Sequence, residues 1–449
     1  MRFGIVKSEN YVLDLPLLSP FAIFAYNNEY LKIAEMKLKK IAIWSTVLLI
    51  VVQIILIVKF WGIQQGSDQG EYIKLAQDCF SRGEWYPMSE HLYYSYLWAP
   101  GLINFFILQL KLFGTVNFNM VLNLLMNLGI VYEIYWLAKR FFSTRTALLS
   151  VIFYNLLYSN YFVVVPAGTE VPFLFLSLTA FCLCVVGKMR HVLIAGLLFA
   201  LANWIRPLVV IFVPVVILYF LYHRYNWKRY LALVVPMVAF ALVVGFATQQ
   251  KIGYFCFQSS TSGCNLIMTA NDKAYGGVAT SLFRDSTSTC YIENAKSLTF
   301  VEKDAIWKER AFEWIKDNPG RFVKLYLLKI GGLFVEDSWA DRPILGGNGF
   351  VDSVATGGAS VGVFERFAKM FAKSIVYYLV GILFCYSLFV HRKEIVSEKG
   401  WLLLILLAGI LLTCLFSVSP RYHYPFLFTI VIWAAYGFEH RFIAKRSKE

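Results

Sequence analysis

Long apolar stretches separated by short polar segments run through most of the chain. A membrane-spanning helix needs about 20 mostly apolar residues. Ten stretches approach that length, and because 171–187 and 191–205 are short, we predict about ten spanning helices within a range of roughly nine to twelve. The predicted segments are 41–61, 117–138, 146–165, 171–187, 191–205, 208–223, 231–248, 367–390, 401–418 and 424–438.

The overall composition agrees with this pattern. The 449 residues are 58% hydrophobic and 17% aromatic, and the mean hydropathy is +0.59. These values are too apolar for a soluble domain of this size. The fold class predicted is therefore an all-α polytopic membrane protein with membrane lipids around it.

Basic residues decide the predicted orientation, because Lys and Arg are retained on the cytoplasmic side. With both termini inside, six cytoplasmic segments hold 21 Lys and Arg against 8 Asp and Glu, and this net of +13 accounts for nearly all of the chain's +14. The positive charge thus reports topology, and no nucleic-acid partner is expected. The six segments are 1–40, 138–146, 188–191, 222–230, 391–400 and 439–449.

Four parts follow from this topology. Residues 1–40 form a cytoplasmic N-terminal segment, and 41–248 form a transmembrane core that includes a first outer loop, 62–116. Residues 249–366 form a large outer loop, in which 13 basic and 13 acidic residues cancel. Residues 367–449 supply the last spanning helices and a basic cytoplasmic tail.

Both outer loops contain further predicted helices. Residues 96–113 are too short to span comfortably and suit a helix on the outer face. Thr299 and Glu302 have the spacing of a capping box, which predicts a helix ending at Asp317. The segment 322–335 is apolar but short and contains two lysines, so we expect it to lie in the interface or to re-enter the membrane.

Four cysteines fall in the outer loops, where an oxidising compartment permits disulfides. We favour a bridge between Cys256 and Cys264, which would close a short loop; free thiols are the alternative.

Met36 begins a segment that looks like an ordinary membrane-protein start, so we expect residues 1–35 to be dispensable. No cleavable signal peptide is recognisable.

Several polar residues follow the first spanning segment. On a helix starting near Ser67, the side chains of Asp68, Glu71 and Tyr72 share one face. A carboxylate there suits a general base that takes a proton from an acceptor hydroxyl. The alternative is an ordinary helix cap on a solvated loop. Further along, His91 is a candidate contact for a sugar or acceptor, although a surface or packing role is the more common one for such a histidine.

Charges at the outer ends of predicted spans are costly and point to a site. Glu170 begins one helix, where the helix dipole also favours a carboxylate. Arg206 and Arg421 lie at outer helix ends, and an arginine presents a fork of donors suited to phosphate, although interfacial snorkelling is the alternative. Tyr422 and His423 accompany Arg421. No zinc-ligand spacing, Walker loop or dinucleotide-binding glycine motif is present in the sequence.

Five segments, in order, resemble the GT-C fold of membrane glycosyltransferases, particularly the protein O-mannosyltransferase and lipid A aminoarabinose transferase branch. The resemblance covers about residues 60–438 and implies a GT-C helical bundle with helices on its outer face. The segments are SDQGEYIKLAQDCFSRGEWYP, YLWAPGLINFFILQLKLFG, LIAGLLFALANWIRPLVVIFVP, ERAFEWIKDNPGRFVKLYLLK and SPRYHYPFLFTIVIWAAYGFE.

This resemblance implies transfer of a sugar from a polyprenyl-phosphate donor to a lipid, glycan or protein acceptor on the outer side of a bacterial inner membrane. By position, Asp68 is then the general base and Glu170 the second acid near the acceptor. Arg421, with Tyr422, His423 and Arg206, lies near the donor phosphate. The implied acceptor or sugar contacts are Glu71, Tyr72, Trp85 and His91.

Gln69 stands where many relatives have Glu, which puts a paired-acid metal site in doubt. No metal ligands and no cofactor are assigned, and participation of a divalent metal stays open. No lysine matches the phosphate-binding lysine of the aminoarabinose branch. Two other functions also stay open: a transporter or flippase of a lipid-linked saccharide, and a surface-polysaccharide ligase or polymerase with a lipid diphosphate donor.

Overall fold

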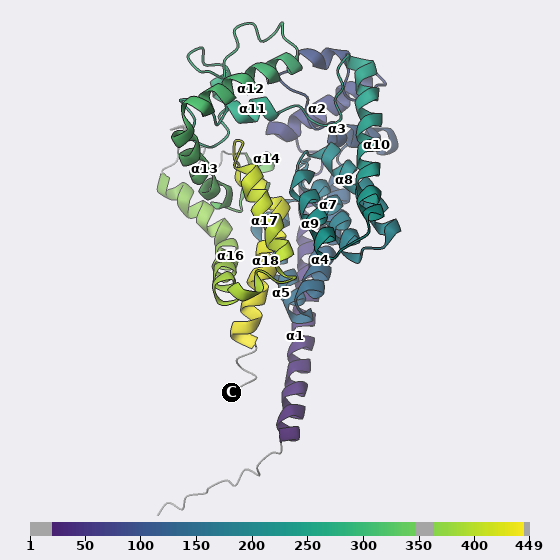
Figure 1. Cartoon of the computed structure of the whole chain (residues 1–449), viewed down its shortest axis with the longest axis vertical. Helices are drawn as coiled ribbons and strands as arrows, with labels where there is room; N and C mark the ends of the chain where they lie inside the picture. Colours follow the sequence, from purple (N-terminus) through teal and green to yellow (C-terminus); the bar gives the residue numbers. More distant parts are fainter. Residues whose placement is uncertain (1–19, 347–362, 444–449) are drawn as a thin grey trace, which may run out of the picture.

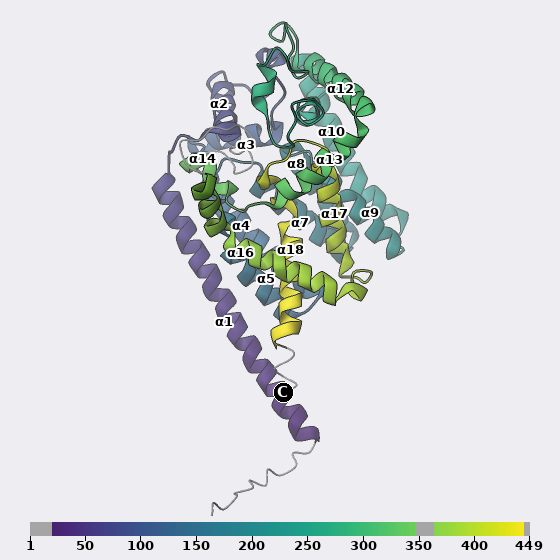
Figure 2. The same cartoon turned by 90° about the vertical axis from the view of Figure 1, so that its left-hand side faces the viewer.

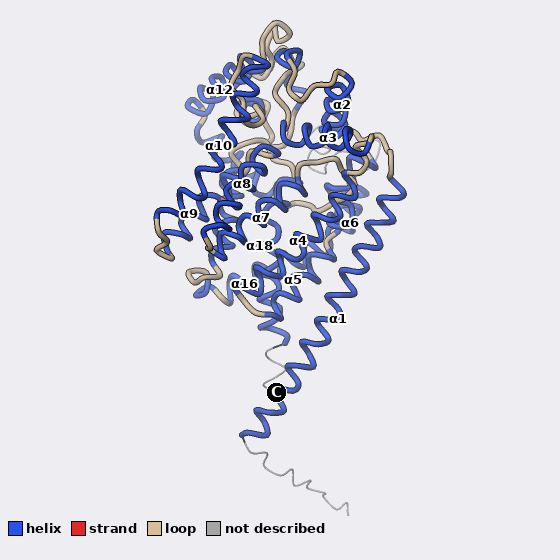
Figure 3. Tube along the Cα trace, turned by 90° about the vertical axis from the view of Figure 1, so that its right-hand side faces the viewer, coloured by secondary structure: helices blue, strands red, loops and turns tan. Residues whose placement is uncertain are grey.

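The structure is a computed structural model that describes the backbone of residues 20–346 and 363–443. These residues form helices and loops, with one isolated antiparallel bridge between Leu97 and Ser260 (Figure 3). Residues 1–19, which make up much of the segment expected to be dispensable, lie outside the described residues. The prediction of an all-α fold is confirmed.

All ten predicted apolar segments are helical in the described chain. The segment 146–165 is divided near Leu157 into two helices, and 208–223 begins with a short 3-10 turn. The helices are α1 (Pro20–Phe60), α4 (Asn119–Phe141), α5 (Thr144–Leu156), α6 (Tyr158–Phe162), α7 (Glu170–Val186), α8 (Met189–Ile205), η2 (Val209–Ile211), α9 (Val213–Tyr222), α10 (Trp227–Ile252), α16 (Val363–Val390), α17 (Gly400–Thr413) and α18 (Leu427–Phe438).

Four of the described helices are long and apolar enough to cross a membrane: Ile33–Phe60, Asn119–Phe141, Trp227–Ile252 and Phe364–Val390. Shorter apolar helices, α7 and α8 among them, pack beside these four and against each other. The chain is therefore a multi-pass membrane protein, and the number of ten crossings stays a prediction.

The segments predicted as outer loops contain the expected helices near Ser67, at 96–113 and at 299–317, together with several short helices that the sequence did not predict. The capping box of α12 is present: the Thr299 Oγ1 accepts the Glu302 N–H at 3.3 Å, and Glu302 Oε2 accepts the Thr299 N–H at 2.7 Å. These helices gather at one end of the molecule (Figure 1). They are α2 (Ser67–Ser81), η1 (Ser89–Tyr93), α3 (Pro100–Phe113), α11 (Ser262–Ile267), η3 (Thr280–Phe283), α12 (Phe300–Asp317), α13 (Pro319–Phe334), η4 (Trp339–Asp341) and α14 (Arg342–Leu345).

Two hydrophobic clusters form the interior. The larger one joins the membrane helices, and the smaller one lies within residues 264–325. We call residues 254–346 the cap, because they lie over one end of the membrane helices (Figure 2). This is the end that the sequence predicts to face outward, and we call it the outer end. The predicted Cys256–Cys264 bridge is wrong: both are free thiols. Cys256 packs against the larger cluster while Cys264 is buried in the smaller one, so the two side chains belong to different cores.

Two helices below the cap, α3 and α8, cross in close contact. Helix α3 crosses α8 at Gly101, where an added Cβ would lie 2.6 Å from the backbone carbon of Trp204. Such a separation excludes any larger residue unless the backbone shifts. Gly101 thus allows α3 to approach the outer end of α8, next to Arg206.

Candidate active site

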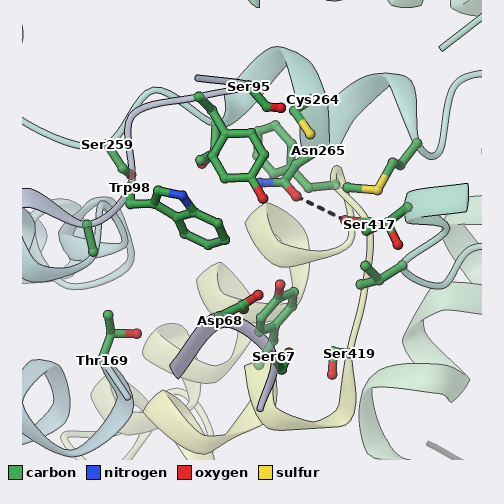
Figure 4. A pocket seen from close by; sticks show the side chains of 18 of the residues that line it. Ser67, Asp68, Ser95, Trp98, Thr169, Ser259, Cys264, Asn265, Ser417 and Ser419 are labelled. Carbon is green, nitrogen blue, oxygen red and sulfur yellow. Dashed lines mark hydrogen bonds between the residues drawn. The ribbon is translucent and has the colours of Figure 1, made fainter. Parts of the chain in front are cut away.

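A cavity of about 1700 Å³ opens between the cap and the outer ends of the membrane helices. Residues from α2, the loop before α3, the start of α7, the end of α8 and the segment after α17 line it together with the cap. In Figure 4, Asp68 and Thr169 lie on one side of the cavity, and Ser95 and Asn265 lie on the opposite side. The cavity therefore has a membrane-helix side and a cap side.

Four charged residues that the sequence singles out meet on the membrane-helix side. Arg421 forms an ion pair with Asp68, and Arg421 Nε lies 3.9 Å from Glu170 Oε1. Arg206 Nη1 is 2.8 Å from the same Glu170 oxygen. The order Asp68, Arg421, Glu170, Arg206 alternates in charge, so two carboxylates and two guanidinium groups balance.

The two pairs differ in exposure. The side chains of Arg206 and Glu170 are 10% and 5% exposed, whereas those of Arg421 and Asp68 are 23% and 28% exposed. A buried ion pair is strongly destabilised when one partner is lost, because the other charge stays uncompensated. The deeper pair is thus suited to hold the site together, and the shallower pair is accessible to a ligand.

Helix ends bring these side chains together. Glu170 is the first residue of α7, and Arg206 caps the C-terminus of α8. Each charge is opposite in sign to the partial charge of its helix end, so the helix dipole stabilises both. Asp68 is in the first turn of α2, and Arg421 follows Pro420 in the 3-10 segment η6 (Pro420–Phe426). A Cβ at Gly168 would lie 2.3 Å from Glu170 Oε2, so the loop before α7 has no space for a side chain there.

A buried glutamine joins the two carboxylate-bearing segments. Gln65, just before α2, donates from Nε2 to Val165 O at 3.0 Å and accepts the Ala167 N–H at 2.8 Å. From α4, Asn123 donates to two further carbonyl oxygens of the same loop. The loop before Glu170 is therefore fixed from two sides. A single glutamine after a spanning segment has no recognisable sequence signal, and sequence analysis did not find it.

Two tyrosines complete this side of the cavity. The Tyr422 ring lies 5.1 Å from Arg206 Cζ and 5.4 Å from Arg421 Cζ, which allows cation–π contact with both guanidinium groups. The Tyr72 ring meets Trp98 edge-on at 5.3 Å. Burial raises the pKa of Tyr72 well above its usual value, so its hydroxyl keeps its proton as a hydrogen-bond donor.

The structure does not bring three predicted acceptor contacts to the cavity wall. Glu71 is exposed on α2. The Trp85 ring lies 4.1 Å below the Lys111 ammonium group. His91 is buried, and its Nδ1 accepts the Met88 N–H at 2.9 Å. Burial lowers the pKa of His91, which keeps the imidazole neutral.

His423 lies behind the cavity wall rather than in it. Its side chain is fully buried, and its Nε2 is 3.7 Å from Asp337 Oδ1. Asp337 is itself fully buried and accepts the Ser159 N–H at 3.1 Å. His423 thus connects the segment that carries Arg421 to the protein interior. Asp337 was not singled out by sequence analysis, because nothing distinguishes it from the other acids of the large outer loop.

The acidic residues of the cavity wall pair with cations within the described structure. In the described part of the chain, no group of three His, Cys, Asp or Glu side chains is arranged to hold a metal ion. The two carboxylates of the cavity wall, Asp68 and Glu170, face guanidinium groups, and the residue after Asp68 is the neutral Gln69.

The family model of dolichyl-phosphate-mannose-protein mannosyltransferases matches residues 99–248. This match confirms the resemblance to membrane glycosyltransferases of the GT-C class. The mannosyltransferase-like segment carries Glu170 and Arg206, while Asp68 and Arg421 lie on either side of it. The deeper ion pair is thus within the matched segment. No curated protein matches the sequence.

Solved structures that match the chain include two structures of an archaeal oligosaccharyltransferase and one of ArnT. The apo oligosaccharyltransferase of Archaeoglobus fulgidus is 12% identical, with a TM-score of 0.48 over 91% of this chain and 52% of its own. The same archaeon's AglB, in complex with an inhibitory peptide and a dolichol-phosphate, is 13% identical, with a TM-score of 0.44 over 90% of this chain and 51% of its own. ArnT from Cupriavidus metallidurans, bound to undecaprenyl phosphate, is 12% identical, with a TM-score of 0.38 over 87% of this chain and 77% of its own. The chain spans about half the length of the oligosaccharyltransferase.

Proposed function

We propose that this protein is a glycosyltransferase that moves a sugar from a polyprenyl-phosphate donor to an acceptor hydroxyl on the outer side of a bacterial inner membrane. The observation that carries the proposal is the Asp68–Arg421 ion pair in the cavity wall. The name of the family that matches residues 99–248 supports a lipid-phosphate sugar donor. The distribution of basic residues supports the outward orientation of the site.

The ion pair explains why the donor binds before the base becomes available. Donor phosphate competes with Asp68 for Arg421, because a guanidinium group binds phosphate and carboxylate with the same fork of donors. When the phosphate takes Arg421, the Asp68 carboxylate is released as a proton acceptor. The free enzyme thus keeps its base in an ion pair until donor arrives.

The chemical step is a single displacement. The acceptor oxygen forms a bond to the anomeric carbon as the bond from that carbon to the phosphate oxygen breaks. The acceptor proton passes to Asp68, and the electron pair of the broken bond leaves on the polyprenyl phosphate, whose charge Arg421 neutralises. Attack opposite to the leaving group inverts the anomeric centre.

The remaining groups of the wall orient the substrates. Glu170 and Arg206 hold the position of Arg421 and Tyr422 from behind, and the protonated hydroxyl of Tyr72 donates to a sugar or acceptor oxygen. No step uses a metal ion.

The test measures release of polyprenyl phosphate from a panel of polyprenyl-phosphate sugars by purified protein in lipid, with lipid, glycan and peptide acceptors. Asp68→Asn should lower turnover at least ~100-fold, as expected for loss of a general base, while donor binding persists. Glu84→Gln is the matched control, since Glu84 is an exposed carboxylate of the same outer loop.

Donor binding without turnover in wild type and variant, whatever the acceptor, would refute the transferase and favour the transporter. Turnover with lipid diphosphate donors alone would favour the polysaccharide ligase or polymerase.

A further inference from the structure

The cap side of the cavity has a one-sided charge. Among the described cap residues that line the cavity, four are cationic and none is a carboxylate. The four cations are Arg284, Lys296, Lys303 and Arg342. This differs from the membrane-helix side, where two carboxylates balance two guanidinium groups.

Most of this positive charge has no compensating partner. Arg342 pairs with Glu336 at 2.5 Å. The Lys303 ammonium group is nearly buried and donates to the neutral carbonyl oxygens of Tyr93 and Tyr94, at 2.8 and 3.2 Å. These two contacts use two of the three N–H donors of Lys303 but bring no negative charge to it.

Arg284 and Lys296 are exposed at the cavity wall, and no ion pair or side-chain hydrogen bond joins either one to another described residue. Of the acids close to them in sequence, Asp285 pairs with Lys273, and Glu293 is exposed and is not part of the cavity wall. A ligand that enters the cap side thus meets two accessible cations without a neighbouring carboxylate.

The uncharged part of the wall is suited to a saccharide. Figure 4 shows the Trp98 indole reaching into the space below Ser95 and Ser259, with Asn265 and Ser417 opposite and hydrogen-bonded to each other at 3.2 Å. Hydroxyl and amide groups bind sugar hydroxyls, and an aromatic face covers the apolar face of a sugar ring. The same wall contains further groups of both kinds: Tyr93, Tyr96, Gln258, Thr261, Phe283 and Trp307.

The volume indicates that more than the reacting sugar is held. Pockets for small ligands measure about 300–1,000 Å³, and this cavity measures about 1700 Å³. A donor sugar and its phosphate at Arg421 leave the cap side for the second substrate.

We infer that the cap side binds the acceptor, and that this acceptor is a saccharide carrying acidic groups, either carboxylates or phosphates, which Arg284 and Lys296 hold. This inference rests on the proposed function, and it specifies the acceptor class that the transferase uses. An acceptor that is held by these cations on the cap side can direct one of its hydroxyl groups across the cavity toward Asp68.

The test measures binding of three fluorescent probes to the full-length protein in lipid nanodiscs without donor. The probes are maltotetraose, the same tetrasaccharide phosphorylated at its non-reducing end, and tetragalacturonic acid. At least one acidic probe should bind ~10-fold or more tightly than the neutral one, and the two acidic probes distinguish phosphate from carboxylate recognition.

Variants locate the effect. Arg284→Gln/Lys296→Gln should remove the preference for the acidic probe. The control Lys316→Gln/Lys324→Gln makes the same change in charge at exposed cap lysines outside the cavity wall and should retain the preference. Equal binding of all three probes, or a preference that survives the first double variant, would overturn the inference.

A further arm uses farnesyl diphosphate and farnesyl phosphate. If Arg284→Gln/Lys296→Gln weakens only the diphosphate, these cations serve a donor and the inference is wrong. Probe binding does not require transfer. If no acidic probe is preferred, the inference fails, but the proposed transfer from the donor is unaffected. If an acidic probe is preferred and the protein shows no turnover, the cap-side site is supported and the transferase is not.

Discussion

Arg206 and Glu170, 36 positions apart in the sequence, form a 2.8 Å ion pair with both side chains nearly buried. Arg206→Met should lower stability by about 3–5 kcal/mol, because it leaves the Glu170 charge uncompensated. The double variant Arg206→Met/Glu170→Gln should recover much of this loss. Unfolding of the four proteins in mixed micelles measures the coupling. A loss in the double variant equal to the sum of the losses in the two single variants would show that the pair contributes no coupling.

Arg421 is expected to bind the donor phosphate. Arg421→Gln should weaken donor binding about 100-fold, which corresponds to the loss of charge-assisted hydrogen bonds. Arg421→Lys should restore only part of the affinity, because lysine keeps the charge but not the planar fork. Equilibrium binding of a polyprenyl-phosphate sugar measures the effect, with the exposed Lys74→Gln as control. Unchanged affinity in Arg421→Gln would assign the phosphate to other cations.

Gln65 should act on catalysis by fixing the loop before Glu170 relative to α2. Gln65→Leu keeps the size but removes both hydrogen bonds, so kcat should fall about 10- to 100-fold with little change in KM. The exposed Gln77→Leu on α2 is the control. A lower thermal midpoint with normal kcat would instead indicate a role in stability alone.

The buried charge of Lys329 in α13 should lower the free energy of unfolding at neutral pH. Its side chain is 1% exposed with no hydrogen-bond partner for Nζ in the described structure, and burial lowers its pKa to about 8. Between pH 8 and about 10.5 the unfolded chain binds more protons at this position than the folded one, so this cost falls as pH rises.

Lys329→Met should therefore stabilise the protein at pH 7 by on the order of 2–3 kcal/mol, and the gain should shrink toward pH 10.5. Thermal midpoints across this pH range measure the effect, with the exposed Lys324→Met as reference. A gain that does not change with pH would show that packing, and not charge, is responsible.

Local patterns in the sequence predicted much of the fold. Apolar length predicted the membrane helices, and the Thr299 and Glu302 spacing predicted α12 to its last residue. Costly charges at helix ends singled out Asp68 and Arg421, because such positions are unusual wherever they occur. These signals require no knowledge of the three-dimensional contacts.

Tertiary contacts were beyond those patterns. The Asp68–Arg421 pair depends on how distant helices pack, and Gln65 and Asp337 act through single hydrogen bonds that leave no periodic signal. Sequence proximity suggested a Cys256–Cys264 bridge, but the two residues pack into different hydrophobic clusters. Closeness along a chain does not determine which core a side chain joins.

The 353 positions between Asp68 and Arg421 also bear on synthesis. Asp68 emerges early from the ribosome, whereas its partner precedes α18, the final membrane helix of the described chain. A nascent protein thus has the Asp68 carboxylate in place while its guanidinium partner is still missing. The ion pair in the cavity wall can therefore form only after the segment before α18 has been made, so the two halves of the pair are joined at the end of synthesis of the described chain.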